Sequence, residues 1–425
     1  MRVLLIGINY APEPSGIAPY TTGLAEHLAS VGHSVTVVTG MPHLPAWRVH
    51  DGYSGKLRLT EERNGVRVMR RAIYVRRDQS AFKRAAYEAS FLVSGLPLTG
   101  IDRPDAILGV IPSLSGGVLA RLMSARFRVG YGLLFQDLMG PAAAQSGISG
   151  GGRVARWASR AERWATERAR IVGAVSTAFF PYLQGLGIPE SRLTHIPNWS
   201  HVRRPDPWDR TSTRARLGWS DDEIVVLHAG NMGNKQHLEQ VLAAADLAQN
   251  RAGPAASNVR FALMGDGSQR PYLEAEARNR TLKNVMFLPP EPDATYPDVL
   301  AAADVLLVAE RASVVDMALP SKLTSYAAVG RPVIAAVNPS GATAREVERA
   351  GFGIIVAAEQ PDRLIESINQ LVSDSEAVDR LGAAGRTFAA SSLDVGAALR
   401  QAEAMVAAIA GDRGHKRPRA LGTAT

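Results

Sequence analysis

The chain has no cysteine among its 425 residues and no long uncharged apolar run. The first absence excludes disulfides, thiolate metal sites and cysteine nucleophiles, and it fits a reducing compartment. No segment approaches the roughly 18 apolar residues of a spanning helix. The apolar start "MRVLLIGINY" ends at a turn without a small-residue cleavage site, which favours a β-strand over a signal peptide. These absences indicate a cytoplasmic protein.

Positive charge is in excess and unevenly spread. The formal net charge is +8, concentrated in "RVMRRAIYVRRDQSAFKRAA" (67–86) and in the tail segment "DRGHKRPR" (412–419). Such runs either maintain solubility and end in a disordered tail, or attract anionic phosphates on a membrane or an acceptor lipid. Nucleic acid is not expected as a partner, because the runs lack aromatic platforms and a recognised binding motif.

The length exceeds that of one ordinary hydrophobic core, so two domains are expected. A buried strand, a glycine turn and an amphipathic helix follow one another at residue 2 and again at residue 224. Strands that alternate with helices predict parallel sheets covered on both faces. The expected fold class is α/β, with two Rossmann-like doubly wound domains facing across a cleft.

The composition also predicts where the domains end. We expect an N-terminal domain over 1–200, a proline-rich charged linker over 201–223 and a C-terminal domain over 224–392. A helix over 393–410 follows, and its spacing leaves open whether it crosses back to the first domain. Residues 411–425 read as a basic disordered tail.

Four stretches follow strands, where open α/β sheets bind ligands. They are "APEPSGIAPY", "HAGNMGNKQHLEQ", "ALMGDGSQRPYLE" and "ALPSKLTSYAAVGRPVIA". The first lacks the G-x-G-x-x-G spacing of a dinucleotide site, so a nicotinamide cofactor is not expected. Taken singly, each is also compatible with an ordinary turn, a solvated lysine or a capped helix.

In the last stretch, Ser321 is expected to cap a helix, and the N–H groups of Ser321, Lys322 and Leu323 to face phosphate oxygens. The loop before it carries Glu310, Arg311 and Asp316 towards the same strand end.

In their order along the chain, these motifs resemble glycosyltransferase family 4, which has the GT-B fold. The resemblance also includes "QDL" and "IPNW", spans residues 1–400, and is strongest to the branch that assembles exopolysaccharide, O-antigen and colanic-acid units. It implies a retaining transferase that moves a sugar from a nucleoside diphosphate to an acceptor hydroxyl. No metal or cofactor is implied, and the chain has no Asp-x-Asp pair. Helix dipoles and basic side chains would stabilise the leaving diphosphate.

The resemblance implies roles for individual residues. The N-terminal domain would bind a glycan or lipid-linked acceptor and the C-terminal domain the nucleotide-sugar donor. Diphosphate and donor binding would fall to Gly16, Asn231, Lys235, Arg311, Ser321, Lys322 and Leu323. Base and ribose would lie near Gly265, Asp266, Gly267, Ser325 and Glu310.

The chain departs from the family pattern at several positions, one of which is His237, where the family usually has glycine. The family has two glutamates eight positions apart. Ser325 occupies the second position, Asp316 lies one residue from the first, and Glu310 is a possible replacement. Gln136 precedes Asp137 where many members have His-Asp, and we take Gln136, Asp137 and Asp316 as the candidate catalytic residues.

The family's polymer branch works on lipid-linked acceptors at the membrane's cytoplasmic face. The segment "AFKRAAYEASFLVSGL" (81–96) combines basic and aromatic residues, as an interfacial helix would. A core helix of the first domain fits the same pattern. The sequence therefore leaves two interpretations of this segment open, peripheral contact with an anionic membrane or a helix in the core of the first domain.

Two other functions fit the same scaffold. A nucleotide-sugar epimerase would use the same site, but it needs a carboxylate and histidine set for proton transfer that the sequence does not display. A catalytically silent binding partner is the other possibility, suggested by Ser325 and Gln136.

Overall fold

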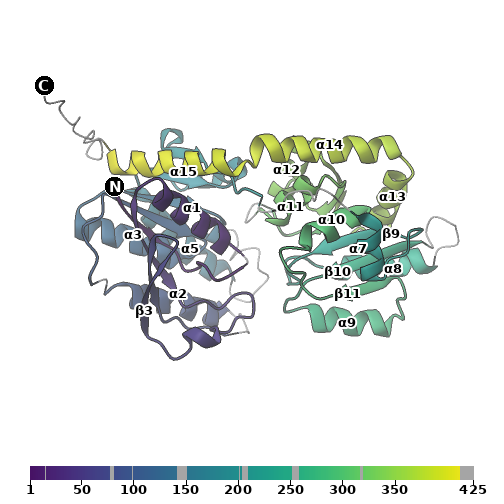
Figure 1. The fold of residues 1–425 in the computed structure, drawn as a ribbon, viewed down its shortest axis with the longest axis horizontal. Helices are drawn as coiled ribbons and strands as arrows, with labels where there is room; N and C mark the ends of the chain where they lie inside the picture. The colour runs from purple at the N-terminus through teal and green to yellow at the C-terminus, as the bar shows by residue number, and fades with distance from the viewer. Residues whose placement is uncertain are drawn as a thin grey trace, which may run out of the picture. The chain divides into compact units, whose positions relative to one another are not determined.

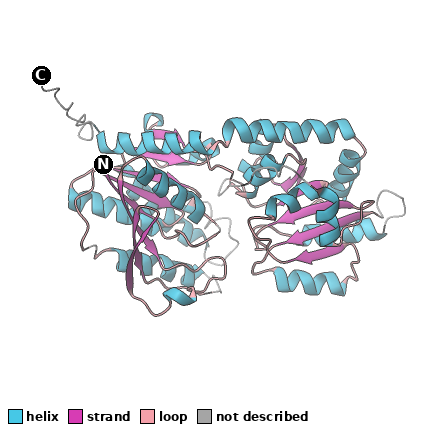
Figure 2. Cartoon of the chain, viewed as in Figure 1, coloured by secondary structure: helices cyan, strands magenta, loops and turns pink. Residues whose placement is uncertain are grey.

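The computed structural model describes residues 1–14, 16–76, 81–97, 99–140, 151–200, 202, 209–250, 258–315 and 319–411. The chain divides into two compact units, Met1–Pro197 with Gly396–Thr425, and Asn198–Val395. We call them the N-terminal unit and the C-terminal unit. In each, strands form a central layer that helices cover (Figure 1, Figure 2).

The N-terminal unit has one eight-stranded sheet in the order β3-β4-β2-β1-β5-β6-β7-β8. Its neighbouring strands are parallel except β3 and β4, which pair antiparallel. The strands are β1 (Arg2–Ile6), β2 (Ser34–Gly40), β3 (Arg58–Arg63), β4 (Val66–Arg71), β5 (Ala106–Ile111), β6 (Tyr131–Phe135), β7 (Ile171–Ala174) and β8 (Leu193–His195). The α-helices are α1 (Ala18–Ser30), α2 (Ala81–Gly95), α3 (Leu114–Phe127), α5 (Gly151–Glu167), α6 (Phe180–Gly185) and α15 (Val395–Ala410), with short 3-10 turns at Asp51–Tyr53, Thr177–Phe179 and Glu190–Arg192.

Strand β1 is buried on both faces because helices cover both sides of the sheet. Val3 and Leu5 pack in the core that includes α1 and α15, whereas Leu4 and Ile6 pack in the core that includes α2 and α3. Side chains alternate between the faces of a strand, so a continuous apolar run is required there. The predicted doubly wound arrangement is confirmed in this unit.

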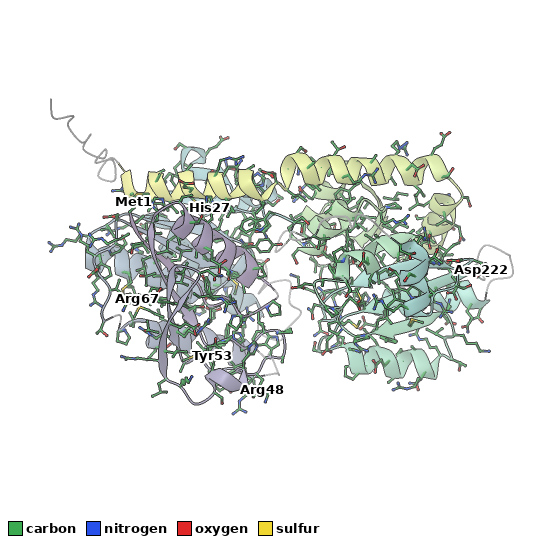
Figure 3. The ribbon with its side chains drawn as sticks, in the orientation of Figure 1. Met1, His27, Arg48, Tyr53, Arg67 and Asp222 are labelled. Carbon is green, nitrogen blue, oxygen red and sulfur yellow. The ribbon has the colours of Figure 1, made fainter. Side chains whose placement is uncertain are left out.

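The last helix, α15, supplies part of this unit's core. Met405 and Ile409 are buried. Glu403 lies 3.2 Å from the imidazole of His27 on α1, and Arg170 donates from Nη1 to the Ile409 carbonyl at 2.7 Å. Figure 3 labels Met1 and His27 beside this helix.

Part of the basic stretch 67–86 is internal, which corrects its interpretation as an anion-attracting surface. Arg70 and Arg71 on β4 are 0% and 3% exposed. Arg70 pairs with Glu61 on β3 at 2.6 Å and donates to the Ala11 carbonyl. A buried, paired guanidinium is not available to an external anion. Residues 77–80 of this stretch lie outside the described residues.

The C-terminal unit has a six-stranded parallel sheet in the order β11-β10-β9-β12-β13-β14. The strands are β9 (Ile224–Ala229), β10 (Val259–Met264), β11 (Val285–Leu288), β12 (Val305–Ala309), β13 (Val333–Val337) and β14 (Gly353–Ala357). The helices are α7 (Arg210–Leu217), α8 (Glu239–Asn250), α9 (Arg270–Asn279), α10 (Tyr296–Ala302), α11 (Lys322–Val329), α12 (Ala342–Ala350), α13 (Pro361–Val372) and α14 (Ser375–Ser392). This strand order is that of a Rossmann-like sheet.

Part of the segment predicted as a linker is instead folded into the C-terminal unit. Helix α7 starts after Asp209, whose side chain accepts a hydrogen bond from the Ser212 N–H at 2.9 Å, and it ends at the left-handed Gly218. Arg214 on α7 is 1% exposed and pairs with Asp304 at 3.2 Å. The proline-rich, aperiodic composition concealed a short helix that is capped at both ends.

Candidate functional site

The strand order of the C-terminal sheet reverses between β9 and β12, which pair at Val226 and Leu227. From β9 the chain proceeds outward to β10 and β11, and it then returns to β12 on the other side. Loops on either side of such a switch point diverge at the carboxyl ends of the strands and leave a crevice. The loops after β9, β10 and β12 carry most of the predicted donor residues.

The glycine turns after β9 and β10 are joined backbone to backbone. The Gly230 N–H donates to the Met264 carbonyl, and the Met232 N–H to the Asp266 carbonyl, both at 2.8 Å. A Cβ on Gly265 would overlap the carbonyl oxygen of Gly230, and one on Gly267 would lie 2.5 Å from that of Met232. Glycine is therefore required at both positions, with φ of +134° and +155°. Exposed Asn231 and Asp266 are held side by side by this contact.

Lys322, the first residue of α11, reaches back over the turn after β9. Its Nζ lies 3.1 Å from Nε2 and 3.4 Å from Nδ1 of buried His228, and it donates to whichever of these ring nitrogens carries no proton. A Cβ on Gly230 would lie 3.5 Å from the same Nζ. Burial lowers the pKa of Lys322 to about 7, and the nearby charge of Glu310 opposes this shift. Burial, and then the charge of Lys322, hold the pKa of His228 well below its usual value, so its imidazole is neutral.

Glu310 follows β12 and is only 4% exposed. Burial raises the pKa of its carboxyl, while a hydrogen bond from Thr343 and the charges of Lys235 and Lys322 lower it. Glu310 was predicted as a ribose ligand. Its carboxyl is the counter-charge for Lys235 and Lys322.

Arg311 fixes the loop that carries Lys235. Its N–H donates to the Lys235 carbonyl at 2.9 Å, and its Nε donates to the Asn234 carbonyl at 2.6 Å. These bonds show that Arg311 positions the loop; its predicted contact with the donor stays a prediction.

The start of α11 differs in two details from the sequence prediction. The Ser321 side chain makes no capping hydrogen bond, and the Ser321 backbone is already helical. The Leu323 N–H donates to the Pro320 carbonyl at 3.1 Å, so it is not directed at a ligand. This bond spans three residues instead of four, so it tightens the first turn and uses up that donor. Half-buried Ser325 lies one turn along the helix from Ser321.

Tyr326 is a site residue that the sequence prediction missed. Its hydroxyl accepts from the Ala229 N–H at 2.8 Å, which joins α11 to the end of β9. It lies four residues after Lys322, so both side chains emerge on one face of the helix. The four-residue spacing from Lys322 is the feature of the sequence that could have identified Tyr326 as a site residue.

His237, where the family pattern has glycine, adopts a positive φ of 43°. Histidine tolerates this left-handed region better than most residues. Its Nδ1 lies 3.2 Å from Glu239. The departure in sequence therefore preserves the backbone conformation that glycine would supply.

In the N-terminal unit, the other predicted residues lie after parallel strands of one sheet. Gln136 and Asp137 follow β6, and the Gln136 N–H donates to the Ile111 carbonyl at 2.7 Å. Gly16 precedes α1 with a φ of +67°. Asp316, the third candidate catalytic residue, lies outside the described residues.

A buried polar network lies at the same edge of this unit and was also missed. Glu13 accepts from the N–H groups of His43 and Leu44 at 2.8 and 3.0 Å, and from Asn9 at 2.9 Å. The His43 Nε2 lies 3.1 Å from the Tyr87 hydroxyl. Burial lowers the pKa of His43 despite the adjacent Glu13. The glutamate between two prolines in "APEPSG" could have indicated a polar site, but its partner His43 lies 30 residues further along the chain.

Electrostatically, the crevice of the C-terminal unit can hold a multiply charged anion. Lys235 lies on the loop after β9 and Lys322 at the N-terminus of α11, and both lysines, with the neutral His228, surround the buried carboxylate of Glu310. Within the described ranges, no three His, Asp or Glu side chains converge as metal ligands.

Comparisons with known proteins match both units. A family model described as "Glycosyl transferases group 1" matches residues 209–388, and one described as "Glycosyl transferase 4-like domain" matches residues 15–199. The chain is 31% identical over 411 residues to the putative colanic acid biosynthesis glycosyl transferase WcaI of Escherichia coli strain K12, covering 94% of this chain and 98% of that protein. It is 27% identical to D-inositol 3-phosphate glycosyltransferase of Nocardia farcinica over 46% of this chain and 43% of that protein.

Solved structures show the same fold at low sequence identity. Sucrose-phosphate synthase from Thermosynechococcus elongatus has a TM-score of 0.73 at 19% identity, covering 95% of this chain and 98% of that chain. Anabaena HepE in complex with UDP-glucose has a TM-score of 0.67 at 19% identity, covering 95% and 99%.

The contact between the glycine turns leads to a stability prediction. Gly265→Ala should lower the free energy of unfolding by about 3 kcal/mol or more, because its Cβ meets backbone that cannot move aside. Gly351→Ala is the matched control: φ there is +67°, and a Cβ would meet nothing within 4 Å. That control should cost about 1–2 kcal/mol. Urea unfolding measures both, and equal costs would contradict the close approach of the turns.

Proposed function

Since this chain belongs to glycosyltransferase family 4, in its exopolysaccharide and colanic-acid branch, and has the GT-B fold, we propose that it moves a sugar from a nucleoside diphosphate to a hydroxyl acceptor. The observation that carries the proposal is the position of Lys322 over the Gly230 turn, with Lys235 on the same loop. A diphosphate there would receive two positive charges at the switch point, where such sheets bind nucleotides. UDP-glucose in the HepE structure supports a nucleotide-sugar donor of this class.

In the proposed reaction, the bond between the sugar's anomeric carbon and the diphosphate breaks, and its electron pair stays on the diphosphate. The acceptor oxygen forms the new bond to the anomeric carbon, and its proton passes to the leaving diphosphate. The lysines stabilise the charge that develops on the leaving group, so we propose that no metal or other cofactor is needed. Retention of the anomeric configuration is part of the proposal and follows from the family resemblance.

The remaining residues receive proposed roles from their positions. The paired turns at Asn231 and Gly265–Gly267 would border the base and ribose, and Ser325 would offer a hydroxyl in place of the family's glutamate. Gln136 and Asp137 would face the sugar and the acceptor. The buried Glu13–His43 pair would shape the acceptor loop through its bonds to the backbone.

Lys322→Met and Lys235→Met should each weaken nucleoside-diphosphate binding by roughly 10- to 100-fold, as expected for loss of a charge-assisted hydrogen bond worth ~1.5–3 kcal/mol. Lys283→Met is the control, because Lys283 precedes β11 at the opposite end of the strands. Titration calorimetry with UDP and GDP measures the effect. Undiminished binding in both lysine variants would place the donor elsewhere.

Turnover distinguishes transfer from the alternatives. Incubation with a panel of sugar nucleotides and an acceptor should release diphosphate only when the acceptor is present, and it should continue in EDTA. An altered sugar nucleotide without acceptor would indicate an epimerase, and no turnover with any donor would indicate a binding partner.

The lowered pKa of Lys322 predicts that donor binding takes up a proton. Above its pKa of about 7, the amine of the free protein is mostly neutral. A bound diphosphate favours the ammonium and raises that pKa, so affinity should fall as pH rises from 7 to 9. Calorimetry at pH 8 in two buffers of different ionisation enthalpy should show uptake of about one proton. The same uptake in Lys322→Met would contradict the assignment.

We further propose that the acceptor is lipid-linked and that α2 contacts the membrane. Tyr87 and Phe91 on one face of α2 are buried, whereas Phe82 and Val93 on the opposite face are 82% and 68% exposed. An exposed apolar face beside basic residues suits a lipid interface. No helix in the described part of the chain has the length and apolar character to cross a membrane.

Phe82→Ser/Val93→Ser should therefore reduce co-sedimentation with vesicles of phosphatidylglycerol and phosphatidylcholine several-fold. Leu57→Ser is the control, since Leu57 is 77% exposed but precedes β3. Equal losses in the two proteins, or no loss in either, would refute a specific contact through α2.

A further inference from the structure

A cavity at the other edge of the N-terminal sheet has no part in the proposed transfer. Its volume is about 590 Å³, and it lies at the amino ends of β1, β5, β6 and β7, which are neighbours in the sheet. Gln136 and Asp137 follow the carboxyl end of β6, so the cavity and the predicted acceptor residues lie at opposite ends of the strands. Five arginines line it: Arg2, Arg103, Arg128, Arg168 and Arg170.

The charge in this cavity is unbalanced. Asp105 is the one carboxylate among the lining residues, which leaves a formal excess of four positive charges. Its Oδ2 already accepts a hydrogen bond from the Arg2 N–H at 2.7 Å. Like charges gathered around one cavity repel each other and raise the local concentration of anions.

Two of the arginines donate hydrogen bonds to backbone carbonyls at the ends of helices beside the cavity. Arg103 donates from Nε and Nη2 to the carbonyls of Phe127 and Arg128, at 3.0 and 3.2 Å, and so caps α3. Arg170 caps α15 in the same way through the Ile409 carbonyl. These contacts explain two of the five arginines as structural.

The other three are exposed and available. Among the described residues, no hydrogen bond or ion pair engages the guanidinium groups of Arg2, Arg128 or Arg168. A planar guanidinium binds phosphate oxygens in bidentate fashion, which a lysine cannot do.

Arg128 also occupies a position that favours glycine. It is the C-cap of α3, with φ 54° and ψ 51° in the left-handed region. A non-glycine residue there costs roughly 1–2 kcal/mol. Fold stability therefore does not explain this arginine, whereas a charge on the cavity rim does.

We propose that this cavity binds a phosphate-bearing anion through Arg2, Arg128 and Arg168. The anion is either a soluble phosphate or diphosphate, or the headgroup of an anionic phospholipid. This proposal stands on the cavity alone and does not depend on the transferase reaction.

The first test uses inorganic diphosphate and a protein with Lys235→Met and Lys322→Met, so that the donor site does not contribute. Adding Arg128→Gln/Arg168→Gln should weaken binding by about tenfold or more, as expected from two charge-assisted contacts. Arg48→Gln/Arg58→Gln removes the same charge from exposed positions outside the cavity and should leave binding unchanged.

Arg128→Gly separates a ligand-binding role from a structural one. It should raise the free energy of unfolding, because glycine suits the left-handed position, while it weakens binding. If Arg128 only supported the fold, its replacement by glycine would lower both the free energy of unfolding and the affinity for the anion.

Vesicles distinguish the two sources of phosphate. If the headgroup is the ligand, the cavity variants should sediment less than the parent protein with phosphatidylglycerol vesicles. Their sedimentation with phosphatidylcholine vesicles should equal that of the parent protein. Diphosphate should then bind none of the proteins. If neither diphosphate binding nor vesicle binding responds to the cavity substitutions, the proposal is overturned.

Discussion

Burial of the central strands on both faces is the constraint on which the rest of the molecule depends. Strands β1 and β9 have helices on each side, so their side chains are apolar except near the strand ends, where Arg2 begins β1 and His228 lies next to last in β9. Polar and charged groups that act on ligands can then lie only where strands end. In the C-terminal unit this brings Lys235, Glu310 and Lys322 together although they are far apart in sequence. In the N-terminal unit the same rule separates two edges, one with Gln136 and Asp137 and the other with the arginine cavity.

Much of the fold could be predicted because this constraint leaves a clear pattern. Apolar runs that alternate with amphipathic segments predicted the parallel sheets of both units, and each unit has one. The antiparallel β3–β4 pair was missed because its strand β4 carries buried arginines, of which Arg70 is paired with Glu61 on β3. Composition alone cannot show that a basic residue has such a partner.

The site was predictable to the level of loops but not of contacts. The carboxyl ends of parallel strands lie at one edge of the sheet. The sequence therefore sufficed to predict that the glycine turns and the lysines lie close together. The link from Tyr326 to Ala229 and the Glu13–His43 pair depend on side-chain direction and on contacts between segments that are distant in sequence. The order of apolar and polar residues along the chain does not specify such contacts.

The position of α15 has a consequence for synthesis of the protein. The C-terminal unit is continuous in sequence, whereas the core of the N-terminal unit needs Met405 and Ile409 from the last described helix. During translation, the second unit therefore has all its residues before the first does. Until α15 emerges from the ribosome, the face of β6 and β7 at Gly132 and Gly173, against which Ile409 and Met405 lie, lacks its cover. The unit synthesised first is thus the last to complete its core, and exposed strand surface of this kind is what chaperones recognise.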